Sequence, residues 1–188
     1  MVDQKLEECI ARVQRGDHVA FTYVVEKYQS LAYNIARSIV HNSEDAEEVA
    51  QDAFVKIYRF IGQYNGESRF SSWLYKIVFN TALTKSNKTA RDIARDDEMI
   101  KTQKYEVGSE GDDLGGLVYQ DQKRIIEETL SRLPDEDRLI ITLFYLGEKS
   151  IAEITEITTW KHSNCKVKLM RARKKLKVLL EDRKNDLI

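Results

Sequence analysis

The sequence is poor in the residues that interrupt helices, with one proline and 8 glycines among 188 residues. An all-β protein needs such residues at its many turns, and a nucleotide site on a glycine-rich loop needs several glycines close together. The hydrophobic content of 42% is nevertheless enough to build cores. The composition therefore predicts a folded, mostly helical protein.

Cysteines and histidines are also scarce and scattered. Cys9 and Cys165 lie at opposite ends of the chain without metal-type spacing, a pattern typical of small buried residues rather than of ligands or a disulfide. His18, His41 and His162 stand far apart, and neither a glycine loop nor a nucleophile elbow accompanies them. We therefore expect no enzyme activity, no cofactor and no metal site.

No segment is suited to export or to membrane insertion. The N-terminus lacks a charged stretch that leads into an apolar run, and nowhere do about 18 apolar residues follow one another. The expected location is the cytoplasm, without membrane insertion.

The net charge of −1 hides a strong separation of charges along the chain. Acidic residues crowd the stretch 44–52 and dominate 92–121, whereas lysines and arginines greatly outnumber acids between 161 and 188. This separation indicates a polyanionic partner for the C-terminal end and a basic protein surface as the partner of the first acidic stretch.

Apolar periodicity divides the chain into two helical halves. The expected helices cover 4–14, 19–40, 43–61 and 71–85, and then 120–132, 136–146, 150–158 and 163–180. From about 86 to 119 the periodicity fades, and residues 107–116 (VGSEGDDLGG) have the composition of a linker. We predict an all-α protein with two small helical domains, 1–88 and 120–188, joined by a flexible linker at 89–119.

The second domain ends in a pattern that predicts a helix-turn-helix. Ser150 and Glu153 form a capping box that begins a short helix, and the long last helix follows after a turn. The last helix carries an apolar stripe at spacings of four and three, made by Cys165, Leu169, Ala172, Leu176 and Leu179. Its basic faces then remain free for the major groove of DNA, although a solvated basic face fits the same pattern.

The first domain offers two candidate surfaces. The expected helix at 43–61, with Ser43 as its N-cap, has an acidic face opposite its apolar stripe; plain solvent-facing charge is the alternative. The segment 64–80 combines aromatic rings with Arg69 and Lys76, as a single-stranded nucleic acid requires, since every base offers a ring face and every nucleotide a phosphate. An ordinary aromatic core is the alternative there, and we assign Trp73 and Phe79 to it.

Several segments, in this order, resemble one family. Residues 43–54 (SEDAEEVAQDAF) resemble its polymerase-binding helix, and residues 70–80 (FSSWLYKIVFN) resemble its promoter-melting segment. Leu133 and Pro134, with residues 151–157 and 166–176, resemble its C-terminal helix-turn-helix. On these motifs the chain is identified as a member of the extracytoplasmic-function (ECF) sigma factors of the sigma-70 family, and the match covers nearly the whole chain apart from the linker.

The resemblance implies a factor that binds core RNA polymerase and directs promoter-specific transcription initiation. The first domain would be sigma region 2, which captures the melted −10 element, and the second would be region 4, which binds the −35 element as duplex. An anti-sigma factor is a further possible partner. The expected polymerase contacts are Glu48, Gln51, Asp52 and Val55. The expected contacts to single-stranded promoter DNA are Asn65, Arg69, Phe70, Lys76 and Asn80. The expected contacts to duplex DNA are Ser163, Asn164, Lys166, Met170, Arg171 and Lys174, with Arg171 projecting away from the apolar stripe to read a guanine.

Several positions depart from the family pattern, namely Thr84, Thr159, Lys161 and Val167, and two of them bear on the helix-turn-helix geometry. Thr159 stands where the turn of the helix-turn-helix usually has glycine, and a β-branched residue is unfavourable at positive φ, which predicts a reshaped or extended turn. Lys161 replaces a frequent capping residue, so Ser163 becomes the expected N-cap of the last helix.

A second function stays open, that of a helix-turn-helix regulator that binds operator DNA as a dimer without polymerase. A self-complementary dimer surface would be its mark, and nothing in the first domain suggests one.

Overall fold

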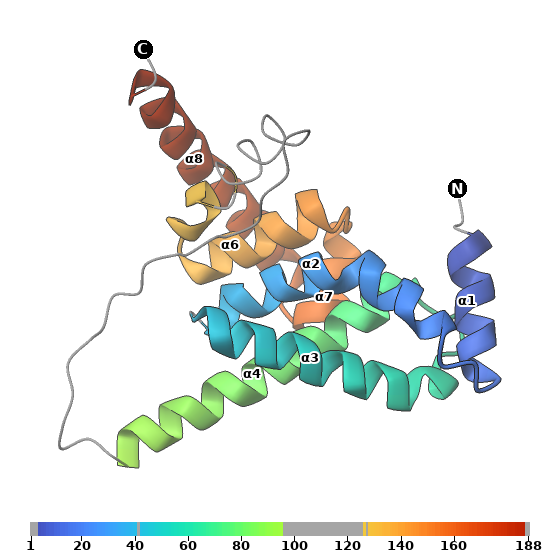
Figure 1. Ribbon diagram of the computed structural model, residues 1–188. Coiled ribbons are helices and arrows are strands. Elements are labelled where there is room, and N and C mark those ends of the chain that lie inside the picture. The colour runs from blue at the N-terminus through green and yellow to red at the C-terminus, as the bar shows by residue number, and fades with distance from the viewer. Residues whose placement is uncertain (1–3, 41, 96–125, 127, 187–188) are drawn as a thin grey trace.

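A computed structural model describes residues 4–40, 42–95, 126 and 128–186. Within these ranges every regular element is helical, which confirms the predicted all-α fold (Figure 1). The α-helices are α1 (Gln4–Gln14), α2 (Ala20–Val40), α3 (Ser43–Phe60), α4 (Phe70–Arg95), α6 (Asp135–Ile141), α7 (Ile151–Thr158) and α8 (His162–Asp186). A 3-10 turn, η1 (Ile61–Gln63), follows α3, and a π-helical segment, η2 (Thr142–Leu146), continues α6.

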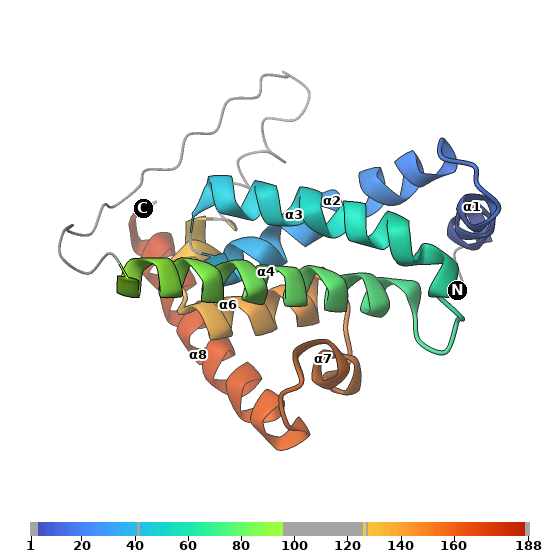
Figure 2. The ribbon, with the colours of Figure 1, turned by 90° about the horizontal axis from the view of Figure 1, so that it is seen from below.

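Helices α2, α3 and α4 form the body of the first half, and α1 lies against one end of it (Figures 1 and 2). Alanines let these helices approach closely, because a small side chain brings the backbones together. Ala32 and Ala36 of α2 and Ala46 and Ala53 of α3 are each 0% exposed. Among the described helices, none combines the length and apolar character needed to cross a membrane.

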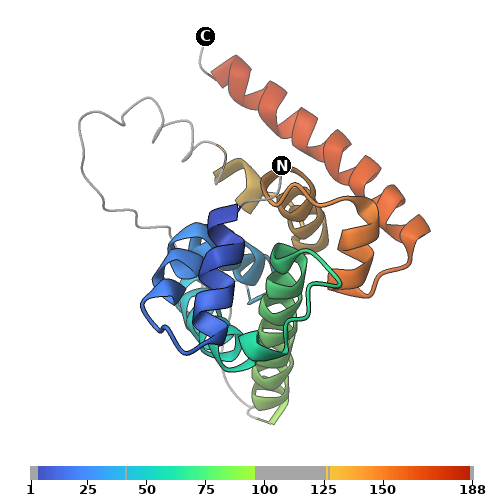
Figure 3. The same cartoon turned by 90° about the vertical axis from the view of Figure 1, so that its right-hand side faces the viewer.

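In the second half, α8 packs on α6 and α7 through the apolar stripe that the sequence predicts. Cys165, Leu169 and Ala172 are buried, and Leu176 and Leu179 are half-buried. The C-terminal part of α8 extends away from the rest of the molecule (Figure 3). One face of this helix therefore serves the core while most of its remaining surface is accessible.

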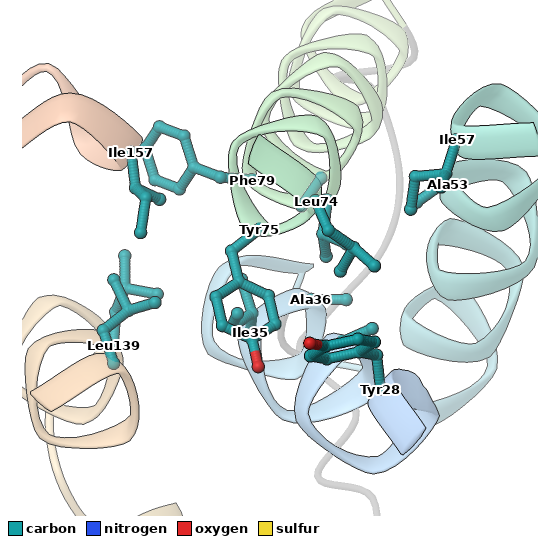
Figure 4. Close-up of a cluster of buried hydrophobic side chains, with 14 of the residues drawn as sticks. Tyr28, Ile35, Ala36, Ala53, Ile57, Leu74, Tyr75, Phe79, Leu139 and Ile157 are labelled. Atoms are coloured by element: carbon teal, nitrogen blue, oxygen red, sulfur yellow. The ribbon is translucent and has the colours of Figure 1, made fainter. Parts of the chain in front are cut away.

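The two halves share one hydrophobic core. Phe79 of α4 points toward Ile157 of α7, and Leu139 of α6 lies on the same side of α4 (Figure 4). All three side chains are at most 5% exposed. In this structure the second half is therefore docked on α2 and α4 of the first.

Helix ends differ in part from the predictions. The capping box of Ser150 and Glu153 is confirmed. Ser43 as a cap is wrong, because the side chain of Asn42 accepts the hydrogen bond of the Asp45 N–H at 3.1 Å. Ser163 as a cap is also wrong, because α8 already begins at His162. Helix α4 continues to Arg95, beyond the predicted end at 85, whereas the first residues of the predicted helix 120–132 lie outside the described ranges.

The turn between α7 and α8 keeps its left-handed residue without glycine. Thr159 has φ of 61° and ψ of 9°, and its N–H donates to the Thr155 carbonyl at 2.9 Å. The predicted reshaping of the turn is therefore wrong, and the β-branched residue adopts the unfavourable conformation. The turn therefore holds local backbone strain at Thr159.

Candidate nucleic-acid and polymerase interfaces

Helix α3 turns the predicted acidic face toward solvent. Glu48, Gln51, Asp52 and Val55 are all exposed, and Val55 keeps 50% of its surface accessible although it is apolar. The opposite side of the helix is buried, so the predicted division of faces is confirmed. Whether the exposed face meets polymerase stays a prediction.

Glu48 already has a partner within the chain. Lys85 of α4 lies 2.6 Å from Glu48 and 3.0 Å from Asp45, and its hydrogen bonds to these two carboxylates raise the pKa of its ammonium group. These two ion pairs of Lys85 join α3 to α4 at the surface. Glu48 therefore offers a partly neutralised charge, whereas Gln51 and Asp52 stand exposed beside it.

The loop between η1 and α4 is held in place by hydrogen bonds. The amide of Gln14, in α1, donates to the carbonyls of Ile61 at 2.9 Å and Tyr64 at 3.1 Å. The Tyr64 hydroxyl donates to the Ser68 carbonyl at 2.7 Å, and the Asn65 side chain accepts from the Glu67 N–H at 3.2 Å. The loop therefore presents its side chains from a defined backbone.

Four of the five residues predicted to contact single-stranded DNA are accessible. Asn65 lies on the loop, the side chain of Arg69 is 75% exposed, and Lys76 and Asn80 are exposed one helical turn apart on α4. Their exposure is compatible with binding but does not test it.

Phe70 is a correction to the predicted site. It is only 4% exposed, and its ring packs against Tyr28, Tyr64 and Trp73, with centroids 5.2 to 6.0 Å away. A ring enclosed in this way cannot stack on a base. The rings of Tyr64 and Trp73 are only half-buried, and they supply the accessible aromatic surface instead. The sequence prediction placed Trp73 in the core, because a run of several aromatic residues does not reveal which ring is buried.

On α8, the predicted duplex-binding residues other than Arg171 form an accessible face. Lys166, Met170 and Lys174 follow at spacings of four, and Ser163 and Asn164 are exposed at the start of the helix. Met170 and the neighbouring Val167 are 54% and 56% exposed. An apolar strip between lysines on a free helix face can meet base edges while the lysines meet phosphates.

Arg171 does not project away from the other helices as predicted. Its guanidinium lies against Asp137 of α6, with Nη2 at 3.1 Å and Nε at 3.3 Å from Oδ1. Asp137 is 0% exposed, and Lys175 donates to its other oxygen at 2.6 Å. This pairing could not be predicted from the sequence, because an acid in a first helical turn usually faces solvent and complements the helix dipole.

Comparisons with known proteins match both halves of the chain. The sigma-70 region 2 family model matches residues 24–92, and the sigma-70 region 4 model matches residues 123–176. The ECF RNA polymerase sigma-E factor of Escherichia coli K12 is 32% identical over 180 residues, which cover 92% of this chain and 91% of that protein. The chain belongs to the ECF sigma factors. The ECF RNA polymerase sigma factor SigW of Bacillus subtilis is 28% identical over 186 residues, which cover 96% of this chain and all of that protein.

Solved structures share the fold of this sigma factor. The sigma factor RpoE of Bartonella quintana, in complex with the anti-sigma factor NepR, superposes with a TM-score of 0.66 at 20% identity, covering 86% of this chain and 96% of that one. CnrH, in complex with the cytosolic domain of CnrY, gives a TM-score of 0.60 at 21% identity, covering 95% and 99%. The family-model matches place most of α2, all of α3, the loop and most of α4 in region 2, and α6 to most of α8 in region 4.

Region 4 also uses several of its bases internally. Lys168 is 8% exposed, pairs with Glu136 and lies over the Trp160 ring at 4.8 Å. Arg173 donates to the Tyr145 hydroxyl at 2.8 Å. The accessible basic face of α8 is therefore narrower than the sequence indicates.

Proposed function

We propose that this sigma factor binds core RNA polymerase and directs it to promoters, with region 2 holding the melted −10 strand and region 4 the −35 duplex. The observation that carries this is the presence of both regions, in this order, in one chain whose relatives are RNA polymerase sigma factors. An autonomous DNA-binding regulator has no use for region 2. The contribution of the chain is binding rather than catalysis, and it acts in the cytoplasm.

The exposed face of α3 is the proposed polymerase contact. Its carboxylates suit a basic protein surface, and Val55 supplies apolar area at the centre of a polar patch. Asp52 and Gln51 contribute most to the affinity for polymerase, because an ion pair with Lys85 partly neutralises the charge of Glu48.

The loop and the exposed side of α4 form the proposed site for the unpaired −10 strand. Arg69 and Lys76 would meet phosphates, and Asn65 and Asn80 would donate to or accept from base edges. Tyr64 and Trp73 offer ring faces for stacking in place of Phe70. The strand would run along this side of region 2.

The accessible face of α8 is the proposed −35 reader. Lys166, Met170 and Lys174 would lie in or beside the major groove, with Ser163 and Asn164 at the end of the helix that enters it first. Arg171 reaches DNA only by giving up its pair with Asp137. An anti-sigma factor is a proposed partner as well, since RpoE of Bartonella quintana was solved with one.

Run-off transcription with purified core polymerase and a promoter library tests this function. We expect initiation at a defined set of promoters only when both the chain and core polymerase are present, weak DNA binding by the chain alone, and a monomer on gel filtration. Tight sequence-specific DNA binding by a dimer of the chain, without any stimulation of polymerase, would support the autonomous regulator instead.

A further inference from the structure

The tip of the loop between η1 and α4 carries an asparagine followed directly by a glycine. Asn65 and Gly66 are both exposed, and no other asparagine in the sequence precedes a glycine. Asparagine is a thermolabile residue, because the backbone nitrogen that follows it is placed along the chain to close a five-membered ring on its side-chain carbonyl carbon. Glycine obstructs that approach least, since it has no side chain. The pair therefore combines an electrophilic amide with an unshielded nitrogen.

The backbone conformation of Gly66 leaves its nitrogen open. Gly66 has φ of 79°, which L side chains rarely adopt, and a Cβ built there would meet no atom within 4 Å. Within the part of the chain that the structure describes, the Gly66 N–H donates to no other group. The nitrogen can therefore attack without first breaking a hydrogen bond or displacing a side chain.

The side chain of Asn65 is folded back toward the same peptide. Its Oδ1 accepts a hydrogen bond from the Glu67 N–H at 3.2 Å, which closes an Asx turn across Gly66. This bond directs the amide group along the backbone rather than into solvent. A donor on the carbonyl oxygen also stabilises the negative charge that the oxygen gains when a nucleophile adds to Cγ. The turn therefore both positions and activates the amide.

Hydrogen bonds on either side hold this tip in its conformation. The Gln14 amide donates to the Tyr64 carbonyl at 3.1 Å, and the Tyr64 hydroxyl donates to the Ser68 carbonyl at 2.7 Å. They anchor both ends of the segment and leave the peptide between Asn65 and Gly66 exposed. The tip thus keeps its turn, while the bond rotations of ring closure stay confined to two exposed residues.

Two other asparagines show what this position has in addition. Asn80 lies within α4, where helical hydrogen bonds occupy the backbone N–H groups and ring closure has to break them. The side chain of Asn42 is engaged with Asp45, from which it accepts a backbone hydrogen bond as the cap of α3 and to whose carboxylate it donates at 3.1 Å. Both amides are therefore held away from the reaction that the geometry permits at Asn65.

The reaction needs only water. The Gly66 nitrogen loses its proton to solvent and forms a bond to Cγ of Asn65, and the bond from Cγ to the side-chain nitrogen breaks, so that ammonia leaves and a cyclic imide remains. Water then adds to one of the two imide carbonyl carbons, and the bond from that carbon to the ring nitrogen breaks. Opening at the side-chain carbonyl gives aspartate at position 65, and opening at the main-chain carbonyl gives isoaspartate. Both products carry a new carboxylate, and nothing is oxidised or reduced.

A carboxylate at this position opposes the proposed role of the loop. The Asn65 amide both donates and accepts hydrogen bonds, as a base edge requires, whereas a carboxylate only accepts. Its negative charge would also lie among the phosphates that Arg69 and Lys76 are proposed to meet. The proposed polymerase face on α3 and the −35 face on α8 belong to other helices and stay unchanged. Modification of one residue therefore separates strand binding from the other proposed contacts.

We propose that Asn65 is a site of self-modification, at which the Gly66 nitrogen converts it to aspartate or isoaspartate without an enzyme and thereby ends the capacity of region 2 to hold the unpaired −10 strand. The consequence for the strand rests on the proposed function of region 2, whereas the modification itself does not. Each copy of the factor then has a chemical lifetime set by its own loop. An aged copy still occupies polymerase and the −35 duplex, so it competes with intact copies.

Peptide mapping by mass spectrometry follows the modification in full-length protein incubated at mildly alkaline pH, which favours loss of the Gly66 amide proton. Cleavage after Arg59 and Arg69 yields a peptide with Asn65 as its only asparagine, and chromatography separates its aspartate and isoaspartate forms. Three variants are aged in parallel. Gly66→Ala adds a side chain beside the nitrogen, and Gly62→Ala makes the same change at an exposed glycine of η1 where a Cβ also meets no atom within 4 Å. Asn65→Gln lengthens the side chain, so that only a larger ring can form.

We expect Asn65 to be modified at least about tenfold faster than Asn42 or Asn80. Gly66→Ala, but not Gly62→Ala, should slow the modification by about tenfold, which corresponds to about 1.4 kcal/mol in the barrier. Circular dichroism establishes that each variant is folded. Equal rates at the three asparagines of the wild type would overturn the proposal, and so would a folded Gly66→Ala protein that is modified at the wild-type rate.

Holoenzymes made from fresh and aged protein are then compared in run-off transcription. We expect initiation from duplex promoters to fall in proportion to the modified fraction, while pull-down of core polymerase stays unchanged. Aged Asn65→Gln should keep the activity that it had when fresh, and fresh Asn65→Asp should reproduce the loss. Complete modification with undiminished initiation would overturn the proposal. Absence of initiation by the fresh wild-type holoenzyme would instead refute the proposed function of the chain, while the peptide map still decides whether Asn65 modifies itself.

Discussion

Arg171→Ala removes two hydrogen bonds from a carboxylate that has no access to water. Asp137 is 0% exposed, and the lost N–H groups are those 3.1 and 3.3 Å from its Oδ1, whereas Lys175 remains on Oδ2 at 2.6 Å. Hydrogen bonds to charged groups contribute about 1.5–3 kcal/mol. Because the Arg171 side chain is 51% exposed and Lys175 stays in place, we expect a loss of about 1–2 kcal/mol in the free energy of unfolding.

Lys174→Ala is the matched comparison, one turn along the same helix. Lys174 is exposed, so its removal should change the free energy of unfolding by less than about 0.5 kcal/mol. It should weaken holoenzyme binding to all promoters alike and reduce the salt dependence by about one unit, as expected for a lost phosphate contact. Arg171→Ala should destabilise the protein without altering preference at a single base position.

Urea unfolding followed by circular dichroism gives the stability of both variants, and a promoter-library selection with each holoenzyme gives the base preference. Equal m-values are needed for the midpoints to be compared as stabilities. An Arg171→Ala protein that unfolds like the wild type but tolerates any base at one −35 position would refute the reasoning. Arg171 would then leave Asp137 when DNA binds and read a guanine, as the sequence first suggested.

Asp52→Lys should weaken polymerase association without loss of stability, whereas Glu48→Lys should also lower stability because it breaks an ion pair with α4; pull-down and urea unfolding separate the two effects. Asn65→Ala should impair transcription from duplex promoters but not from a premelted bubble; equal impairment on both would place Asn65 outside strand opening. Burial would raise the pKa of Glu153, but hydrogen bonds from Ser150 and Ser72 outweigh it and lower the pKa to about 2 from 4.5. This stabilisation is present above about pH 4.5 and lost toward pH 2. Ser150→Ala should therefore cost about 1 kcal/mol at pH 7, and its deficit in thermal unfolding should shrink over that range.

Features of the fold could be predicted from sequence where they depend only on the residues of a single helix. The apolar stripe of α8, the outward acidic face of α3 and the capping box at Ser150 depend on residues three or four apart, and each is found as expected. The cap of α3 was misplaced by one residue because Asn42 and Ser43 are equally good caps. The positions of such features along the chain can therefore be predicted from the local sequence to within one residue.

Features that depend on contacts between helices could not be predicted. Nothing in the sequence near Phe70 says that Tyr28, far along the chain, encloses its ring. Likewise, Asp137 looks like an ordinary first-turn acid until α8 brings Arg171 over it. The docking of region 4 on α4 is of the same kind, since Lys149 and Ser71 are joined only by the fold.

Part of the charge that is segregated along the sequence is thus neutralised by ion pairs within the protein. On region 4, Glu136 and Asp137 take up Lys168, Arg171 and Lys175 from the basic helix. Glu148, Glu153 and Glu156, beside and on α7, line an open cleft next to the proposed strand site, so carboxylates stand close to it. Since phosphate contacts supply most of the affinity for nucleic acid, a chain that neutralises its own cations binds DNA weakly when alone. Dependence on polymerase follows from the internal pairing of charge rather than from a shortage of basic residues.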